Sequence, residues 1–171
     1  MDVEPSTSQL RIPGPGNAFL LSQLGADAAA LFGGLVAELD LTPPTAGLLR
    51  AIATRPGQSQ QALAKVLGTP PSRLVPLVDG LEERGVIERR RNPDDRRLHA
   101  LYVTEDGTEL LRRIGEAGKA QEDAMCAALD DAERAVLHGL LTRMAADRGL
   151  TPGVHPGYRT LPGRSNRRSR G

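Results

Sequence analysis

Aromatic residues and cysteine are the scarcest components of this 171-residue chain. Tryptophan is absent and only two tyrosines and two phenylalanines occur, so the core must be built from leucine, valine and alanine. The single cysteine, Cys126, excludes an internal disulfide and a cysteine metal site. It falls late in a long helical pattern, where we expect a buried and inert thiol.

Patterns that carry catalysis or bind metals are also missing from the sequence. The histidines His99, His138 and His155 are scattered, with no second ligand at metal spacing. No nucleophile stands with a base, and Gly14-x-Gly16 neither follows a strand nor opens a phosphate-binding helix. We therefore predict no catalytic residue, no metal and no cofactor, and a chain that is not an enzyme.

Long apolar runs are lacking as well. Residues 1–16 mix polar residues with Pro and Gly, without the basic start and apolar run of a signal peptide, and predict a disordered leader. The longest apolar run, residues 28–37, is about half of what a bilayer span requires. The sequence thus predicts a cytoplasmic protein with no membrane partner.

Positive charge is concentrated in one stretch. The formal net charge is only +1, yet residues 84–97 hold six arginines against three acids. Residues 149–171 add five arginines and no acid within a Pro- and Gly-rich segment, which predicts a disordered basic tail. This tail either adds nonspecific DNA affinity through counterion release or is solvated without a role.

Residues 69–104 predict one helix followed by two short strands. Thr69 is a suitable N-cap, Pro70 suits the first helical position, and Gly85 suits the end. Apolar residues recur between them at helical spacing, and the arginine-rich strands after Gly85 flank a turn at residues 92–95. A preceding short helix, capped by Ser59 and ended by Gly68, completes helix-turn-helix spacing. A helix of this length fits a DNA major groove, and the charged hairpin can reach phosphates or the minor groove.

Pro76 lies inside the predicted helix that follows Thr69, which would be the recognition helix, and proline is unfavourable there. In the helix interior it removes a hydrogen bond to the Ser72 carbonyl and costs about 3 kcal/mol. Either the helix bends there or its regular part begins near Ser72, and we favour a retained helix with a local bend.

The candidate DNA contacts come from the helix N-termini and the hairpin. Arg73 suits a guanine edge and a phosphate equally. Three consecutive arginines in a strand alternate in direction, so at least one should pair internally with Glu88, Asp94 or Glu83. The predicted DNA-binding residues are Ser59, Gln60, Thr69, Ser72, Arg73, Arg89, Arg91, Asp95, Arg96 and Arg97.

The hairpin also carries a family signature. Asp95, Arg97, Val103, Thr104 and Gly107 resemble the wing motif of the MarR family of bacterial transcription regulators, and the pattern extends over roughly residues 17–148. The resemblance implies that the Arg97 side chain enters the minor groove and that Asp95 holds it in place. It also implies a homodimer on an imperfect DNA palindrome. A small-molecule effector would bind in a cleft lined by the first, second and fifth helices.

Two helical regions flank the predicted DNA-binding lobe. Residues 17–40 form a helix with a wide apolar face, which either covers its own core or is shared with a second subunit, as the resemblance implies. Residues 105–148 predict two further helices, with ten acids and six bases. The residues predicted to lie in a dimer interface are Leu24, Leu31, Leu35, Leu137 and Leu141.

The expected fold is mainly α with a small β-hairpin wing. It has a leader at 1–16, an N-terminal dimerisation helix at 17–40, a winged helix-turn-helix lobe at 41–104, C-terminal dimerisation helices at 105–148 and a tail at 149–171. The predicted function is a dimeric, sequence-specific transcriptional regulator, a repressor released by an effector. The alternative is a winged-helix module that uses its charged hairpin on an acidic protein and binds no DNA.

Overall fold

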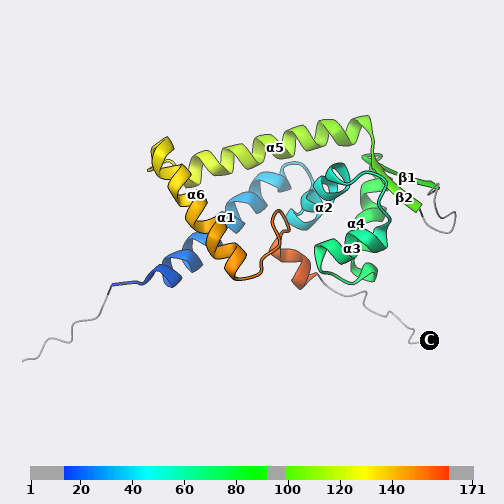
Figure 1. Cartoon of the computed structure of the whole chain (residues 1–171). Helices are drawn as coiled ribbons and strands as arrows, with labels where there is room; N and C mark the ends of the chain where they lie inside the picture. The colour runs from blue at the N-terminus through cyan, green and yellow to red at the C-terminus, as the bar shows by residue number, and fades with distance from the viewer. Residues whose placement is uncertain (1–13, 92–98, 162–171) are drawn as a thin grey trace, which may run out of the picture.

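The computed structural model describes residues 14–91 and 99–161 as a mainly helical chain with one antiparallel hairpin (Figure 1). Its elements are α1 (Asn17–Ala37), α2 (Pro43–Thr54), α3 (Gln60–Leu67), α4 (Pro71–Glu83), β1 (Ile87–Arg91), β2 (His99–Val103), α5 (Glu105–Met125), α6 (Asp131–Asp147) and the 3-10 helix η1 (Pro156–Thr160). The predicted fold class is confirmed.

Side-chain caps start several of the helices, among them the predicted cap Ser59 of α3. The Ser59 hydroxyl accepts from the Ala62 N–H at 3.2 Å, and Thr104 accepts from Gly107 at 3.1 Å. Asp130 and Glu133 form a reciprocal capping box at the start of α6.

Thr69 does not cap α4, contrary to the prediction. Its N–H donates to the Ala64 carbonyl and so closes the end of α3, after Gly68 in the left-handed conformation with φ 64°. The N-cap of α4 is Pro70, and the helix begins at Pro71. The helix then continues through Pro76 to Glu83, so the retained helix is confirmed.

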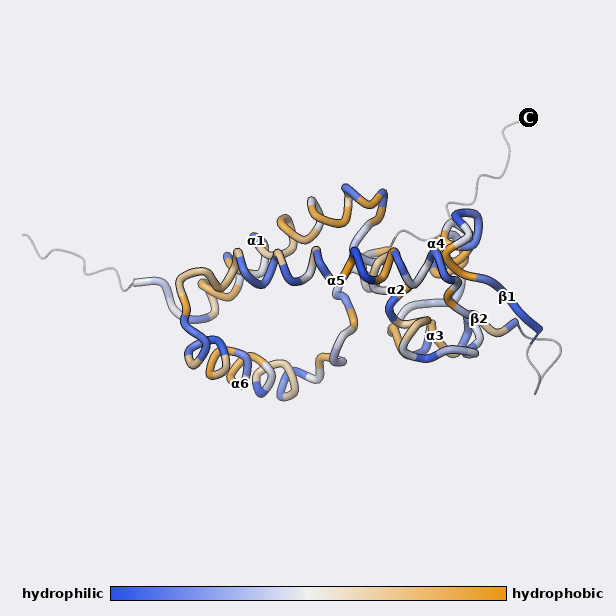
Figure 2. Tube along the Cα trace, turned by 90° about the horizontal axis from the view of Figure 1, so that it is seen from above, coloured by the Kyte–Doolittle hydropathy of each residue, from blue (hydrophilic) through white to orange (hydrophobic). Residues whose placement is uncertain are grey.

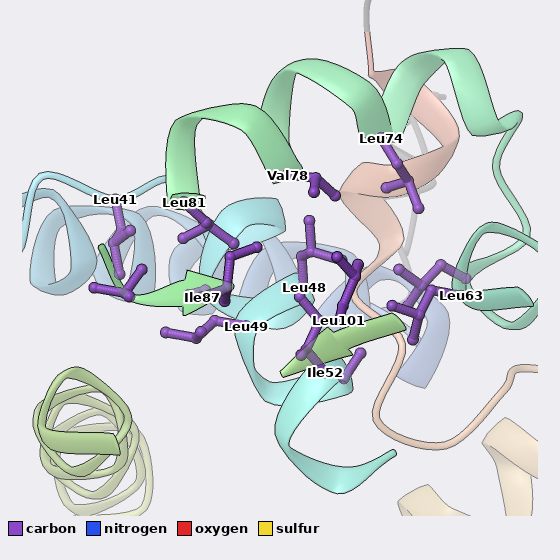
Figure 3. Packing of buried hydrophobic residues seen from close by; sticks show 14 of the residues in the cluster. Leu41, Leu48, Leu49, Ile52, Leu63, Leu74, Val78, Leu81, Ile87 and Leu101 are labelled. Atoms are coloured by element: carbon purple, nitrogen blue, oxygen red, sulfur yellow. The ribbon is translucent and has the colours of Figure 1, made fainter. Parts of the chain in front are cut away.

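The core is built around α2, which packs against α1, α4, α5, β2 and η1. Figure 3 shows Leu74, Val78 and Leu81 pointing from α4 toward this centre. All three side chains are fully buried, because they recur on one face of the helix. The other fully buried large side chains are Leu48, Leu49, Ile52, Leu63, Ile87, Leu101, Val36 and Tyr158.

Strand β1 pairs with β2 in a register that joins Ile87 to Val103. The segment before α3 extends this hairpin, because the Leu101 N–H donates to the Gln58 carbonyl and its carbonyl accepts from Gly57, both at 3.0 Å. A bridge between Ser59 and Ala100 completes the contact. The wing is therefore fixed to the start of α3.

Helices α5 and α1 lie beside each other and extend away from the wing, whereas α6 lies apart from both (Figure 2). Among the described residues, α1 is long and apolar enough to cross a bilayer, and only 6% of its apolar window is buried. The longest uninterrupted apolar run is still residues 28–37, and α1 reaches this length because further apolar residues lie on the N-terminal side of Asp27.

Residues 150–161 have a defined structure, although the sequence predicted a disordered tail at 149–171. This segment turns back toward the winged-helix lobe and ends in η1, whose Tyr158 is 1% exposed (Figure 1). Its Pro and Gly content suggests disorder, but Tyr158 is buried in the core and Val154 and Leu161 pack against it. Residues 162–171 lie outside the described part, as do the leader residues 1–13.

Candidate nucleic-acid interface

Helix α4 has a buried side and an exposed side. Its apolar residues face the core, while Ser72 and Pro76 are exposed and Arg73 is half-buried. The N-terminal half of α4 thus presents Ser72 and Arg73 beside its own positive dipole end, which favours an anion such as a DNA phosphate.

The start of α3 meets the start of α4 and the wing at a shallow surface hollow of about 300 Å³. The Gln60 side-chain amide donates to the Pro71 carbonyl at 3.4 Å, which links the two helix N-termini. The hollow brings together the predicted Ser59, Gln60 and Arg89, together with Gln61, Pro71, His99 and Leu101. Gln61 and His99 were not predicted, since neither stands in a charged pattern.

Arg89 is engaged within the chain. Its guanidinium donates to the Asp79 carboxylate at 2.5 Å and also pairs with Glu82, both on α4. Burial lowers the pKa of Arg89, but the hydrogen bond to Asp79 and the charges of Glu82 and Asp79 raise it above its ordinary value. Arg89 therefore joins the wing to the recognition helix through two carboxylates of α4, and its DNA contact stays a prediction.

The other two arginines of β1 have different surroundings. Arg90 pairs with Glu88 and lies over the Tyr102 ring at 4.7 Å, which confirms that one of the three pairs with Glu88. Arg91 is exposed at the end of the strand, next to the wing tip. The tip itself, with the predicted Asp95, Arg96 and Arg97, lies outside the described residues.

Thr69 is 6% exposed, and its hydroxyl is buried without a hydrogen-bond partner among the described residues. It cannot reach a phosphate from this position, so the prediction of a DNA contact there was wrong. Its role in closing α3 explains the difference, because the residue after a left-handed glycine turns toward the helix it ends.

Arg84 connects the end of the recognition helix to the turn between α1 and α2, a link that the sequence analysis did not predict. Its guanidinium donates to the carbonyl of Asp40 at 2.8 Å and to that of Leu39 at 3.0 Å. Asp40 adopts the left-handed conformation with φ 54°, which turns the chain between α1 and α2. Arg84 binds a backbone carbonyl 44 residues away, so no local pattern in the sequence indicates this contact.

A cavity of about 520 Å³ lies at the predicted cleft between α1, α2 and α5. Its walls come from Phe32 of α1, from four residues of α2 and from Leu111 and Ile114 of α5. Two glycines of α5, Gly115 and Gly118, leave one wall without side chains. Residues 153–155 form a further wall that the sequence analysis did not predict.

Comparisons with known proteins agree with this geometry. A model of the MarR family matches residues 39–98. A protein of Thauera aromatica named for transcriptional regulation of the hcr operon is 42% identical over 112 residues, which cover 66% of this chain and 68% of the relative. The chain belongs to the MarR family.

Two solved structures superpose on the chain. The crystal structure of MarR has a TM-score of 0.68 at 26% identity and covers 81% of this chain and 94% of its own. The repressor CouR bound to a 23-mer DNA duplex has a TM-score of 0.67 at 30% identity. It covers 76% of this chain and 92% of its own. This MarR-family chain is therefore a transcriptional regulator of the DNA-binding, winged-helix kind.

Proposed function

We propose that this MarR-family chain acts in the cytoplasm as a homodimeric repressor of an imperfectly palindromic DNA site, released by a small-molecule effector. The main support for a dimer is that α6 is exposed along its length. No described element packs closely along this 17-residue helix, and none of its residues is buried. Its exposed apolar side chains are Val136, Leu140, Leu141 and Met144.

Helix α1 offers a second apolar surface near the same end of the molecule. Leu24 is 54% exposed, and Leu31 and Leu35 are half-buried. Monomeric proteins rarely expose contiguous apolar area of this kind. A second copy that covers α1 and α6 would bury both faces, and an isologous contact closes after two copies. The half-buried Leu137 and the exposed Leu141 would lie in this interface.

Dimerisation supports binding to a palindrome. Two copies of α4 related by a twofold axis reach successive major grooves about one helical turn apart. Ser72 and Arg73 would face the groove, Ser59 and Gln60 the backbone, and Arg91 the flanking phosphates. The wing-tip residues Asp95, Arg96 and Arg97 would reach the minor groove, where a guanidinium is attracted by the negative potential.

Effector release is supported by the link between α1 and α4. The cavity contacts α1 through Phe32, and Arg84 joins the turn that follows α1 to the end of α4. A ligand that moves α1 relative to α2 would therefore shift α4 and change the spacing of the two recognition helices.

A selection of genomic fragments with purified protein, at about 150 mM salt, tests DNA recognition. The best fragment is then titrated with wild type and with Arg97→Ala. We expect a palindromic fragment whose affinity falls in the variant while the fold and the dimer are retained. Recovery of nothing above nonspecific binding would contradict the proposal and favour a winged-helix module that binds an acidic protein.

Sedimentation velocity of Leu141→Asp tests the dimer. We expect a monomer, because a carboxylate in an apolar interface loses its hydration without a partner. Thr142→Asp is the matched control, since Thr142 is an exposed polar neighbour on the same helix and the dimer should persist. A dimer that survives Leu141→Asp as well as the control places the interface elsewhere.

A further inference from the structure

The C-terminal segment, residues 150–161, is fastened to α2 by Tyr158. The buried phenol hydroxyl donates to the Pro44 carbonyl at 2.7 Å, and burial raises the pKa of Tyr158. Gly47 makes room for the ring, because a Cβ there would lie 2.8 Å from the hydroxyl oxygen. The segment therefore has a specific seat on α2 and is not a loose end of the chain.

Because Tyr158 binds α2, Gly153, Val154 and His155 form one wall of the 520 Å³ cavity. Of the cavity's other side chains, only Arg50 is ionisable, and the rest are apolar or glycine. No carboxylate of the described residues lines the cavity. A cationic ligand would lose its hydration without gaining a counterion, whereas an anion would face the Arg50 guanidinium.

His155 has a defined tautomer. Its Nδ1 accepts from the Gly157 N–H at 3.0 Å, so the neutral ring carries its proton on Nε2. A Cβ at position 157 would lie 2.8 Å from Nδ1, so glycine gives this hydrogen bond room. Burial lowers the pKa of His155, which favours the neutral ring. The imidazole therefore retains one N–H donor, on Nε2, and His155 lines the cavity.

We propose that the C-terminal segment is a built wall of the ligand site and that His155 on it is a ligand-binding residue. The occupant is a small, mainly apolar anion whose acidic group accepts from His155 Nε2 and faces Arg50. Its apolar part lies over Gly115 and Gly118, which form a flat wall one turn apart on α5. This assignment rests on the proposed effector site and adds to it a residue from outside its three helices.

Ligand binding then holds the segment in place. A ligand bound to both His155 and Arg50 connects the segment to α2, in addition to the Tyr158 anchor. The segment becomes less free to open, so its backbone amides exchange more slowly with solvent when the site is occupied.

Calorimetric titration of the full chain tests the chemistry. The probe is naphthalene-2-carboxylate, and the matched control is naphthalen-2-ylmethylammonium, similar in size and opposite in charge. We expect the anion to bind once per chain and the cation to bind at least tenfold more weakly. Equal binding of the two would overturn the assignment of an anion site.

Three variants locate the probe. His155→Ala should weaken anion binding by roughly tenfold, as expected for one hydrogen bond to a charged group. His155→Gln, which retains a side-chain N–H, should recover part of that loss. Gly118→Leu should abolish binding by filling the cavity from the opposite wall, where nothing lies within 4 Å of an added Cβ. Unchanged affinity in His155→Ala would remove the segment from the site.

Hydrogen exchange of residues 153–161 separates a ligand contact from a structural role. We expect protection to increase with the probe in wild type and not in His155→Ala, while unliganded protection is similar in both. DNA affinity is measured separately on the same variants. Absence of probe binding by the wild type, with normal DNA binding, overturns this inference alone. His155-dependent probe binding without a specific DNA site overturns only the regulatory role.

Discussion

Arg89 of the wing and Asp79 of the recognition helix form an ion pair, with 2.5 Å between Nη2 and Oδ1. Glu82, one turn further along α4, accepts from the same guanidinium. The two DNA-binding elements are thereby held at a fixed relative position. An arginine expected to contact DNA instead determines where its neighbours lie.

Arg89→Ala should therefore weaken DNA binding indirectly. The pair is partly exposed, so we expect a stability loss of only about 1 kcal/mol and an affinity loss below roughly tenfold. The slope of log affinity against log salt should stay unchanged, because no phosphate contact is removed. Arg91→Ala is the matched comparison, and it should reduce that slope by about one if Arg91 contacts a phosphate. A reduced salt slope in Arg89→Ala would instead mean that Arg89 contacts a DNA phosphate.

Gly107→Ala should destabilise the junction between the wing and α5. A Cβ at this position would lie 2.0 Å from the Val86 carbonyl oxygen and 2.7 Å from a Val103 methyl carbon. The backbone must move, so we expect a loss of about 3 kcal/mol in urea unfolding. Gly115→Ala, on the same helix and with nothing within 4 Å, should instead gain about 1 kcal/mol. Similar results for both would mean that the close approach at Gly107 relaxes without cost.

Pro76→Ala should raise stability. Pro76 is exposed within α4 and has no N–H to donate to the Ser72 carbonyl. Alanine would restore this hydrogen bond and has a higher helix propensity than proline. The expected gain is about 1 to 3 kcal/mol in the free energy of unfolding, measured with urea. A loss of stability would mean that packing of α4 depends on proline at this position.

Cys126 should react slowly with thiol reagents. It is half-buried rather than buried as expected, with Sγ 3.5 Å from the Glu122 carboxylate. Burial and this carboxylate raise the pKa of Cys126, so at pH 7.5 a smaller fraction is thiolate than in an ordinary cysteine. Alkylation by iodoacetamide should be slower than for a free cysteine peptide, and its rate should rise with pH. Glu122→Gln should speed it, while a fast wild-type reaction would contradict the raised pKa.

Local signals in the sequence determined where several of the helices begin and end. Ser59, Thr104 and Asp130 cap helices because a short oxygen side chain satisfies N–H groups two or three residues away. Gly68 and Gly85 end helices because their φ values, 64° and 70°, are unfavourable for other residues. These interactions span few residues, so the sequence alone was sufficient to predict them.

Tertiary structure alone decided the interactions that join distant parts of the chain. Arg84 to Asp40, Arg89 to Asp79 and Tyr158 to Pro44 are separated by 44, 10 and 114 residues. An arginine pattern predicts charge but not which acid or carbonyl neutralises it, because the partner depends on how helices pack. The wall that residues 153–155 give to the cavity likewise exists only after Tyr158 is buried against α2. Composition predicted disorder in that segment, and its long-range contacts with α2 and the core decided otherwise.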